Sequence, residues 1–163
     1  MTSHKNGPTS SNVTRPHLLI TGTRGIPAQH GGFETFAEEL ARYLTQQGWH
    51  VSVYCQIQPE QQQTFRPHWQ GIKRIPIVVH GNRAHHTLIF DYKCLRDALT
   101  RPGLILTLGY GGAIFNLLAN LKKRPYLINM DGLEWKRQKW PWYAKIWLKF
   151  NEQIAMQAAT HLI

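Results

Sequence analysis

The chain has 163 residues, of which 42% are hydrophobic and 17% are charged. A chain of this length folds as one domain with a substantial core. Its composition excludes a disordered polymer, a collagen and a coiled coil. The 19 lysines and arginines outnumber the 9 acidic residues and give a formal net charge of +10. Such an excess attracts nucleic acid, anionic lipid or a phosphorylated ligand, and composition does not choose among them.

Targeting features point to a cytoplasmic protein. The apolar runs are shorter than the roughly 18 residues that a membrane-spanning helix needs. Residues 1–16 are polar and lack the apolar core of a signal peptide, so we expect a disordered polar tail. Cys55 and Cys94 lack metal-ligand spacing, and we expect two reduced, buried thiols with no metal and no cofactor.

Hydrophobic patterning predicts strands and helices in alternation. His17–Gly22 is the first strand, and a Gly- and Pro-rich segment separates it from an amphipathic helix that begins at Phe33 and ends near Gly48. His50–Cys55 is the second strand. The glutamine-rich residues 56–70 show no packing pattern, so we expect an exposed loop there.

The remaining residues continue this alternation. We predict strands at 72–80, 104–108 and 126–130, a final strand opening at 161–163, and helices at 87–99, 112–122 and 133–159, the last broken by Pro141. The expected fold class is α/β, with an open, mostly parallel, Rossmann-like sheet and helices on both faces. Such sheets bind ligands beyond the carboxyl ends of their strands.

Glycine-bearing turns follow three of these strand ends. Residues 22–32 match neither the dinucleotide-binding fingerprint nor a P-loop, but Gly31 and Gly32 stand directly before a helix, where free N–H groups bind anions. A long loop with turn glycines explains them equally well. Residues 109–112 (GYGG) either admit a ligand close to the backbone or make a tight turn.

The third turn carries charge. Asp131 and Glu134 follow the strand YLINM, where a carboxylate can orient a hydroxyl or stabilise positive charge. The alternative is a helix N-cap at Asp131 with Glu134 three residues later.

Residues 140–158 place aromatic side chains such as Tyr143 and Phe150 on one helical face. A stripe of this kind usually packs in a core. The surrounding lysines and tryptophans also fit a surface that rests on anionic lipid. The residues proposed for that membrane surface are Lys136, Lys139, Trp140, Trp142, Lys145 and Lys149.

Three segments carry a family resemblance: GTRGIPAQHGGFETFAEELARYL, GWHVSVYC and INMDGLEWKRQKW. Together they resemble the N-terminal domain of a GT-B glycosyltransferase of the family 4 type, in its rhamnosyltransferase-like subgroup, over about residues 17–163. In that family two Rossmann-like domains face each other across a cleft. The N-terminal domain mainly holds the acceptor and the C-terminal domain holds the nucleotide-sugar donor.

The resemblance implies metal-independent, retaining transfer of a sugar, with rhamnose as one option, to a lipid-linked or polysaccharide acceptor. Many members place a histidine where this chain has Asp131, which makes Asp131 the catalytic candidate. The expected substrate-binding residues are Arg24, Gly31, Gly32, Glu34, Gly109, Tyr110, Gly111, Gly112, Gly132 and Glu134.

The donor-binding motifs of the family are not found in these residues, so we expect this chain alone to be inactive. It is then a fragment, the product of a truncated gene, or a half that pairs with a donor-binding chain. The alternative is a non-catalytic membrane-surface or scaffold module, peripheral on the inner face of the plasma membrane. We expect no nucleic-acid partner, because no recognition motif is present.

Overall fold

The computed structural model describes residues 15–29, 31–81, 84–130 and 132–163, so most of the expected tail lies outside the described residues. The strands are β1 (His17–Thr21), β2 (His50–Ile57), β3 (His68–Trp69), β4 (Ile72–Val78), β5 (Leu104–Leu108), β6 (Tyr126–Asn129) and β7 (His161–Leu162). The helices are α1 (Gly32–Gln46), α2 (Ala84–Ala98), α3 (Ala113–Leu121) and α4 (Trp142–Ala158), with the 3-10 turns η1 (Pro59–Gln61) and η2 (Glu134–Lys136).

The strands form one seven-stranded sheet in the order β3-β4-β2-β1-β5-β6-β7. All neighbours are parallel except β3 and β4, which pair antiparallel. This confirms the predicted open, mostly parallel α/β sheet. The chain adds strands on one side of β1 and then on the other, so the connections diverge between β1 and β5. Ligands bind at such a switch point in open α/β sheets.

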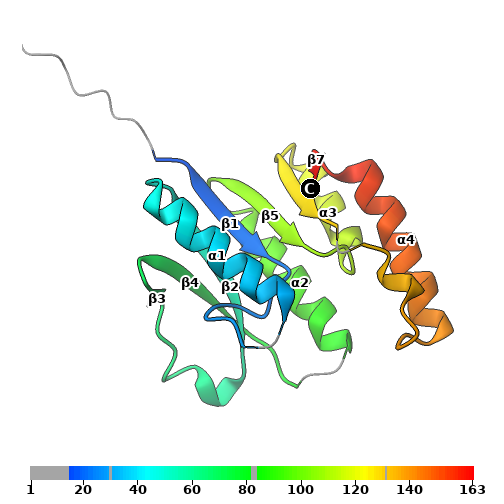
Figure 1. Cartoon of the computed structure of the whole chain (residues 1–163), viewed down its shortest axis with the longest axis horizontal. Helices are drawn as coiled ribbons and strands as arrows, with labels where there is room; N and C mark the ends of the chain where they lie inside the picture. Colours follow the sequence, from blue (N-terminus) through cyan, green and yellow to red (C-terminus); the bar gives the residue numbers. More distant parts are fainter. Residues whose placement is uncertain (1–14, 30, 82–83, 131) are drawn as a thin grey trace, which may run out of the picture.

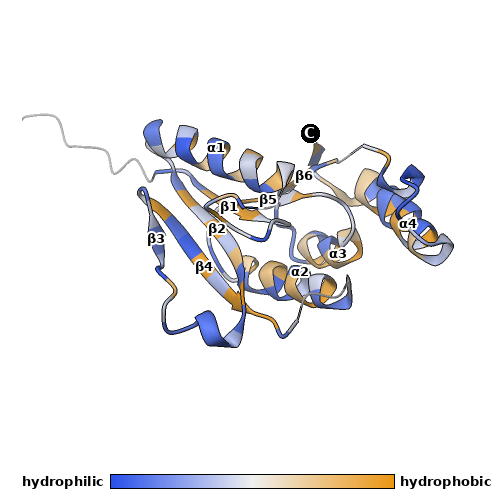
Figure 2. Ribbon diagram, turned by 60° about the horizontal axis from the view of Figure 1, so that its bottom comes forward, coloured by the Kyte–Doolittle hydropathy of each residue, from blue (hydrophilic) through white to orange (hydrophobic). Residues whose placement is uncertain are grey.

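Helices cover both faces of the sheet (Figure 1). α1 covers one face, while α2, α3 and α4 belong to the other. The side chains of β1 divide between the two layers, because Leu18 and Ile20 pack on the α1 side and Leu19 packs on the opposite side. α3 contacts both α2 and α4 and is largely hydrophobic in Figure 2. A strand buried on both faces needs an unbroken apolar run, which the sequence shows at residues 18–20.

The glutamine-rich residues 56–70 are the main error of the sequence analysis. β2 continues to the buried Ile57, which pairs with Val78 of β4. The chain then forms η1 and the two-residue strand β3, whose Trp69 packs against the α1-side core. A two-residue edge strand is too short to produce a hydrophobic period, which is why the sequence indicated only a loop.

The aromatic stripe predicted for residues 140–158 is only partly in the core. Tyr143 is 64% exposed and Phe150 is 52% exposed, so core packing, the first of the two alternatives, is wrong for these two residues. Two polar contacts explain the rotation of α4. The side-chain oxygen of Asn151 accepts the Ile114 N–H at 2.9 Å, and Glu152 accepts the indole N–H of Trp135 at 2.9 Å. Burying these two residues turns the aromatic side chains outward.

Cys55 and Cys94 are both buried and unbonded, as predicted. Burial raises the pKa of each thiol, which keeps both protonated at neutral pH. They therefore act as apolar packing groups.

Gly22 controls how closely the ends of β1 and β5 approach. Its φ of +77° lies in the left-handed region, and a Cβ there would overlap the carbonyl oxygen of Leu108 at the end of β5. Gly48 has a similar φ of +84°, but a Cβ there would meet no atom within 4 Å. Glycine at position 22 therefore meets both a conformational and a steric requirement.

We predict that Gly22→Ala lowers the free energy of unfolding by about 2–5 kcal/mol, the sum of a left-handed backbone penalty and an overlap. Gly48→Ala carries only the backbone penalty and should cost about 1–2 kcal/mol. Urea denaturation of the two variants measures the difference. Equal losses would show that the ends of β1 and β5 do not require this close approach.

Candidate functional site

A cavity of about 380 Å³ opens beyond the carboxyl ends of β1 and β5, next to the N-terminus of α1. We call it the switch-point cavity. All three turns singled out in the sequence reach it. The expected substrate-binding residues that line the cavity are Arg24, Gly31, Gly32, Glu34, Gly109, Tyr110, Gly111 and Glu134. The other two do not line it, because Gly112 caps α3 beside the cavity and Gly132 is exposed outside it. The catalytic candidate Asp131 lies outside the described residues.

Gly31 and Gly32 leave the mouth of the cavity open. Gly31 is the N-cap of α1 in an extended conformation, with φ −174°, and makes no side-chain cap. A Cβ at either glycine would meet no atom within 4 Å. Neither backbone conformation requires glycine, so the turn alone does not account for the pair. Their missing side chains leave room at a helix N-terminus, where backbone N–H groups favour an anion or a hydroxyl oxygen.

Two carboxylates of α1 hold the loop that follows β1. The Ala28 N–H donates to Glu38 Oε2 at 2.6 Å, and the Gln29 N–H donates to Glu34 Oε2 at 3.2 Å. Glu34 is only 6% exposed, so it fixes the loop from inside. This arrangement gives Glu34 a positioning role at the cavity wall.

Glu134 organises the opposite wall around Tyr110. The Glu134 N–H donates to the buried Tyr110 hydroxyl at 2.8 Å. Burial raises the pKa of Tyr110, so the phenol stays protonated at neutral pH. The Glu134 carboxylate accepts the indole N–H of Trp140 at 3.0 Å and pairs with Arg137 at 2.9 Å. Trp140, expected on a membrane surface, therefore lies half-buried in the cavity wall.

Comparison with known proteins assigns the chain to a family. The model of a family described as a domain of unknown function, DUF1972, matches residues 15–163. The chain belongs to the DUF1972 family. No curated protein matches the sequence. The family description states no activity.

Asp91 is a site residue of the DUF1972 domain that sequence reasoning missed. It lies on α2 and lines both the switch-point cavity and a small cavity of about 30 Å³ beside it. A Cβ on Gly112 would come within 3.1 Å of Asp91 Oδ2, so this glycine makes room for the carboxyl group. Burial raises the pKa of Asp91 from 3.8 to about 7. Its only sequence signal is a carboxylate directly after Phe90 on an otherwise buried helical face.

An acid whose pKa is raised by folding binds its proton more tightly in the native state than in the unfolded state. Asp91 should therefore lower the stability of the DUF1972 domain as the pH rises from about 4 to about 7. We predict that Asp91→Asn removes this loss, so the variant gains stability relative to wild type between pH 5 and pH 8. Urea denaturation midpoints of wild type and variant at pH 5 and at pH 8 test this prediction. If the two midpoints differ by the same amount at both pH values, the pKa of Asp91 is not raised.

Among the described residues, no group of three or more His, Cys, Asp and Glu side chains is arranged to hold a metal ion. The described residues of this site include groups that can exchange protons or form hydrogen bonds, among them Asp91, Tyr110 and the backbone N–H groups of α1.

Proposed function

We propose that the DUF1972 domain is the acceptor-binding domain of a retaining glycosyltransferase. In this proposal the switch-point cavity holds the acceptor sugar, and a donor-binding Rossmann-like domain, joined to it or paired with it, supplies the nucleotide sugar. The observation that carries the proposal is the convergence of the three glycine turns on one cavity. The first and third of these turns lie in segments that carry the glycosyltransferase resemblance.

The lining of the cavity supports a sugar ligand. Phe33 and Trp140 offer flat apolar surfaces, while Arg24 and the N-terminus of α1 offer polar groups at the rim. Small-molecule sites commonly combine apolar walls with a few directed polar groups in cavities of about 300–1,000 Å³. A pyranose ring, with hydroxyl edges and apolar faces, matches this combination.

Asp91 supplies the proposed site with an acid–base group. A carboxyl with a pKa of about 7 is close to half-protonated near neutral pH, the condition in which it can both accept and donate a proton. Beside the acceptor hydroxyl, it would serve as a proton acceptor during sugar transfer. The catalytic candidate from the sequence, Asp131, remains a separate proposal.

The proposal predicts that Gly32→Val blocks sugar binding without unfolding the domain. The new side chain would enter open space at the cavity mouth, so it clashes with a ligand and not with protein. NMR titration with methyl glycosides of glucose, galactose, N-acetylglucosamine and rhamnose should show saturable shifts around the cavity. We expect Gly32→Val to weaken the best of these by at least about tenfold.

Thr35→Val is the matched control, because Thr35 is exposed on the first turns of α1 outside the cavity lining. It should bind the glycosides as wild type does. If none of the glycosides shifts cavity resonances, or if Gly32→Val binds as tightly as Thr35→Val, the acceptor proposal is wrong.

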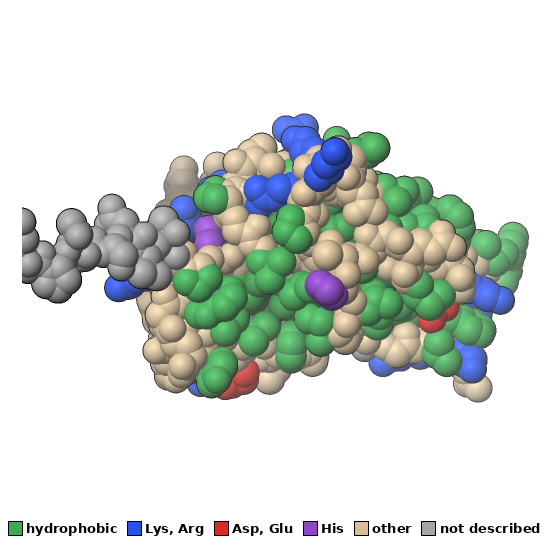
Figure 3. Space-filling view, turned by 90° about the horizontal axis from the view of Figure 1, so that it is seen from above, with side chains coloured by type: hydrophobic (Ala, Val, Ile, Leu, Met, Phe, Trp, Pro, Cys, Tyr) green, Lys and Arg blue, Asp and Glu red, His purple; other side chains and the backbone are tan. Residues whose placement is uncertain are grey.

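A second role is favoured by the outer face of α4. Trp142 is 74% exposed and Ile146 is 61% exposed, alongside Tyr143 and Phe150. Lys136 and Lys139 precede this helix, and Lys145 and Lys149 lie on it. We call these eight residues the aromatic–basic face. Figure 3 shows hydrophobic and basic side chains side by side at its right-hand end, where α4 lies in Figure 1.

We propose that the aromatic–basic face docks on an anionic bilayer, as a membrane-surface module would. Each lysine near an anionic leaflet contributes about 1 kcal/mol, and tryptophan rings lodge at the headgroup level. No helix in the described ranges is long and apolar enough to span a bilayer, so docking would be peripheral. α4 follows the cavity residue Trp140 almost directly, which would bring a lipid-linked acceptor close to the cavity.

Replacing Lys136, Lys139, Lys145 and Lys149 with glutamate should abolish most binding to phosphatidylglycerol-containing vesicles at low salt. Wild type should sediment with these vesicles and be released by high salt, because the attraction is electrostatic. The control replaces Lys73, Arg96, Lys122 and Lys123, exposed residues away from this face, with glutamate at the same change in net charge. Equal losses in both variants, or equal binding to neutral phosphatidylcholine vesicles, would refute docking through this face.

A further inference from the structure

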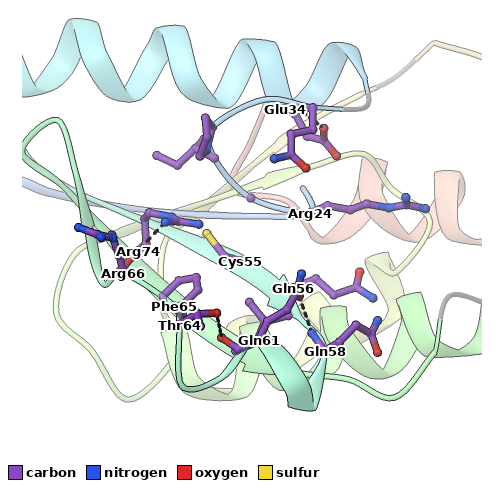
Figure 4. Close-up of a pocket in the computed structure, with 15 residues that line it drawn as sticks. Arg24, Glu34, Cys55, Gln56, Gln58, Gln61, Thr64, Phe65, Arg66 and Arg74 are labelled. Atoms are coloured by element: carbon purple, nitrogen blue, oxygen red, sulfur yellow. Dashed lines mark hydrogen bonds between the residues drawn. The ribbon is translucent and has the colours of Figure 1, made fainter.

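A second cavity, of about 510 Å³, lies beside the first and carries unneutralised positive charge. It extends from the carboxyl ends of β1 and β2 to the residues 56–70 that the sequence analysis took for a plain loop (Figure 4). We call it the arginine cavity. Arg24, Arg66 and Arg74 line it, and Glu34 is the acidic residue among its described lining residues.

The three arginines of this cavity lack the acidic partner that three other arginines of the described residues have. Arg42, Arg101 and Arg137 pair with Glu38, Asp97 and Glu134 at 2.8, 2.6 and 2.9 Å. Among the described residues, no ion pair joins Arg24, Arg66 or Arg74 to a carboxylate. Arg24 and Arg66 are exposed, whereas Arg74 is partly buried. A partly buried cation without a counter-ion is costly, and an anion from solution would relieve that cost at Arg74.

Arg74 is the best-placed of the three. Its guanidinium carbon lies 4.5 Å from the centre of the Phe65 ring, and its Nη1 donates to the Arg66 carbonyl at 3.1 Å. These contacts hold the planar group in place, and Figure 4 shows it directed toward Cys55 inside the cavity. Its Nε is buried and has no hydrogen-bond partner among the described residues. Because this Nε is closed off from solvent, an anion in the cavity would bind through the outer guanidinium nitrogens, whose charge suits a carboxylate or a phosphate.

The glutamine-rich segment supports the wall opposite the sheet. Gln61 Oε1 accepts the Gln58 N–H at 2.9 Å, and Gln58 Oε1 accepts the Gly81 N–H at 3.2 Å. Thr64 Oγ1 donates to the Gln61 carbonyl at 3.2 Å. These bonds tie the segment to the loop after β4 and orient its amide groups. The residues that looked like an unpatterned loop therefore build a polar wall.

The two cavities share Arg24, Glu34 and Gln56, so one ligand can occupy both. We infer that the arginine cavity binds an oxyanion, a phosphate or a carboxylate, of the acceptor whose sugar occupies the switch-point cavity. The acceptor is thus an acidic saccharide or a saccharide phosphate. The acceptor assignment rests on the proposed function, whereas the oxyanion site rests on the arginines alone.

The test is calorimetric titration of the full 163-residue chain at constant ionic strength with inorganic phosphate, glucuronate and glucose. We expect phosphate or glucuronate to bind and glucose to bind far more weakly at this site. The tighter of the two anions shows whether the acidic group of the ligand is a phosphate or a carboxylate. Arg74→Gln should weaken anion binding by about tenfold or more, because hydrogen bonds to a charged group are lost. Arg74→Lys should retain part of the affinity, since it keeps the charge but not the planar fork.

Substitution of the partly buried Arg74 could itself unfold the protein, so two variants at exposed arginines complete the test. Arg66→Gln changes an exposed lining residue and should weaken anion binding in a folded protein. Arg96→Gln changes an exposed arginine of α2 outside both cavities and should leave it unchanged. Binding of neither anion, or equal affinities of the Arg66→Gln and Arg96→Gln variants, would overturn the oxyanion site. Anion binding combined with unaltered glycoside binding by Gly32→Val would sustain this site and refute the acceptor role.

Discussion

The close parallel pairing of β1 with β5 is the constraint on which the rest of the structure depends. β1 is buried on both faces and lies between β2 and β5, so its register sets the ends of both neighbours. Gly22 lets the backbone reach the Leu108 carbonyl, and the chain leaves β1 and β5 in opposite directions from that point. A slip of one residue would move Gly109 away from α1 and separate the turns that form the switch-point cavity.

Polar contacts determine which side chains of residues 134–158 are exposed. Glu134 holds Trp140 in the cavity wall, while Asn151 and Glu152 fix the rotation of α4. With these groups turned inward, Trp142 and Ile146 face solvent. The same 25 or so residues thus contribute an aromatic wall to a cavity and an aromatic surface to the exterior. Leaving any of these buried donors or acceptors unpaired would cost about 1–3 kcal/mol.

Charge is arranged unevenly along the carboxyl edge of the sheet. Around the switch-point cavity, Glu134 neutralises Arg137 and sits near Lys139. Around the arginine cavity, Arg66 and Arg74 have no such partner among the described residues. A ligand that spans the shared residues would therefore meet an aromatic, nearly neutral compartment at one end and a cationic one at the other. That polarity suits a molecule with a sugar ring and an acidic group.

The α/β class, the order of the long elements and the three turns can be predicted from the amino-acid sequence, because they follow from local periodicity and from glycine at strand ends. Residues 17–20 and the pattern from Phe33 to Leu44 carry such local signals, and both elements form as predicted. The roles of Asp91, Arg74 and Trp140 become visible only in the folded chain. Asp91 acquires its raised pKa from burial, and Arg74 has no ion pair with an acid among the described residues. Such properties depend on which distant residues surround a side chain, and neighbours along the chain do not encode them.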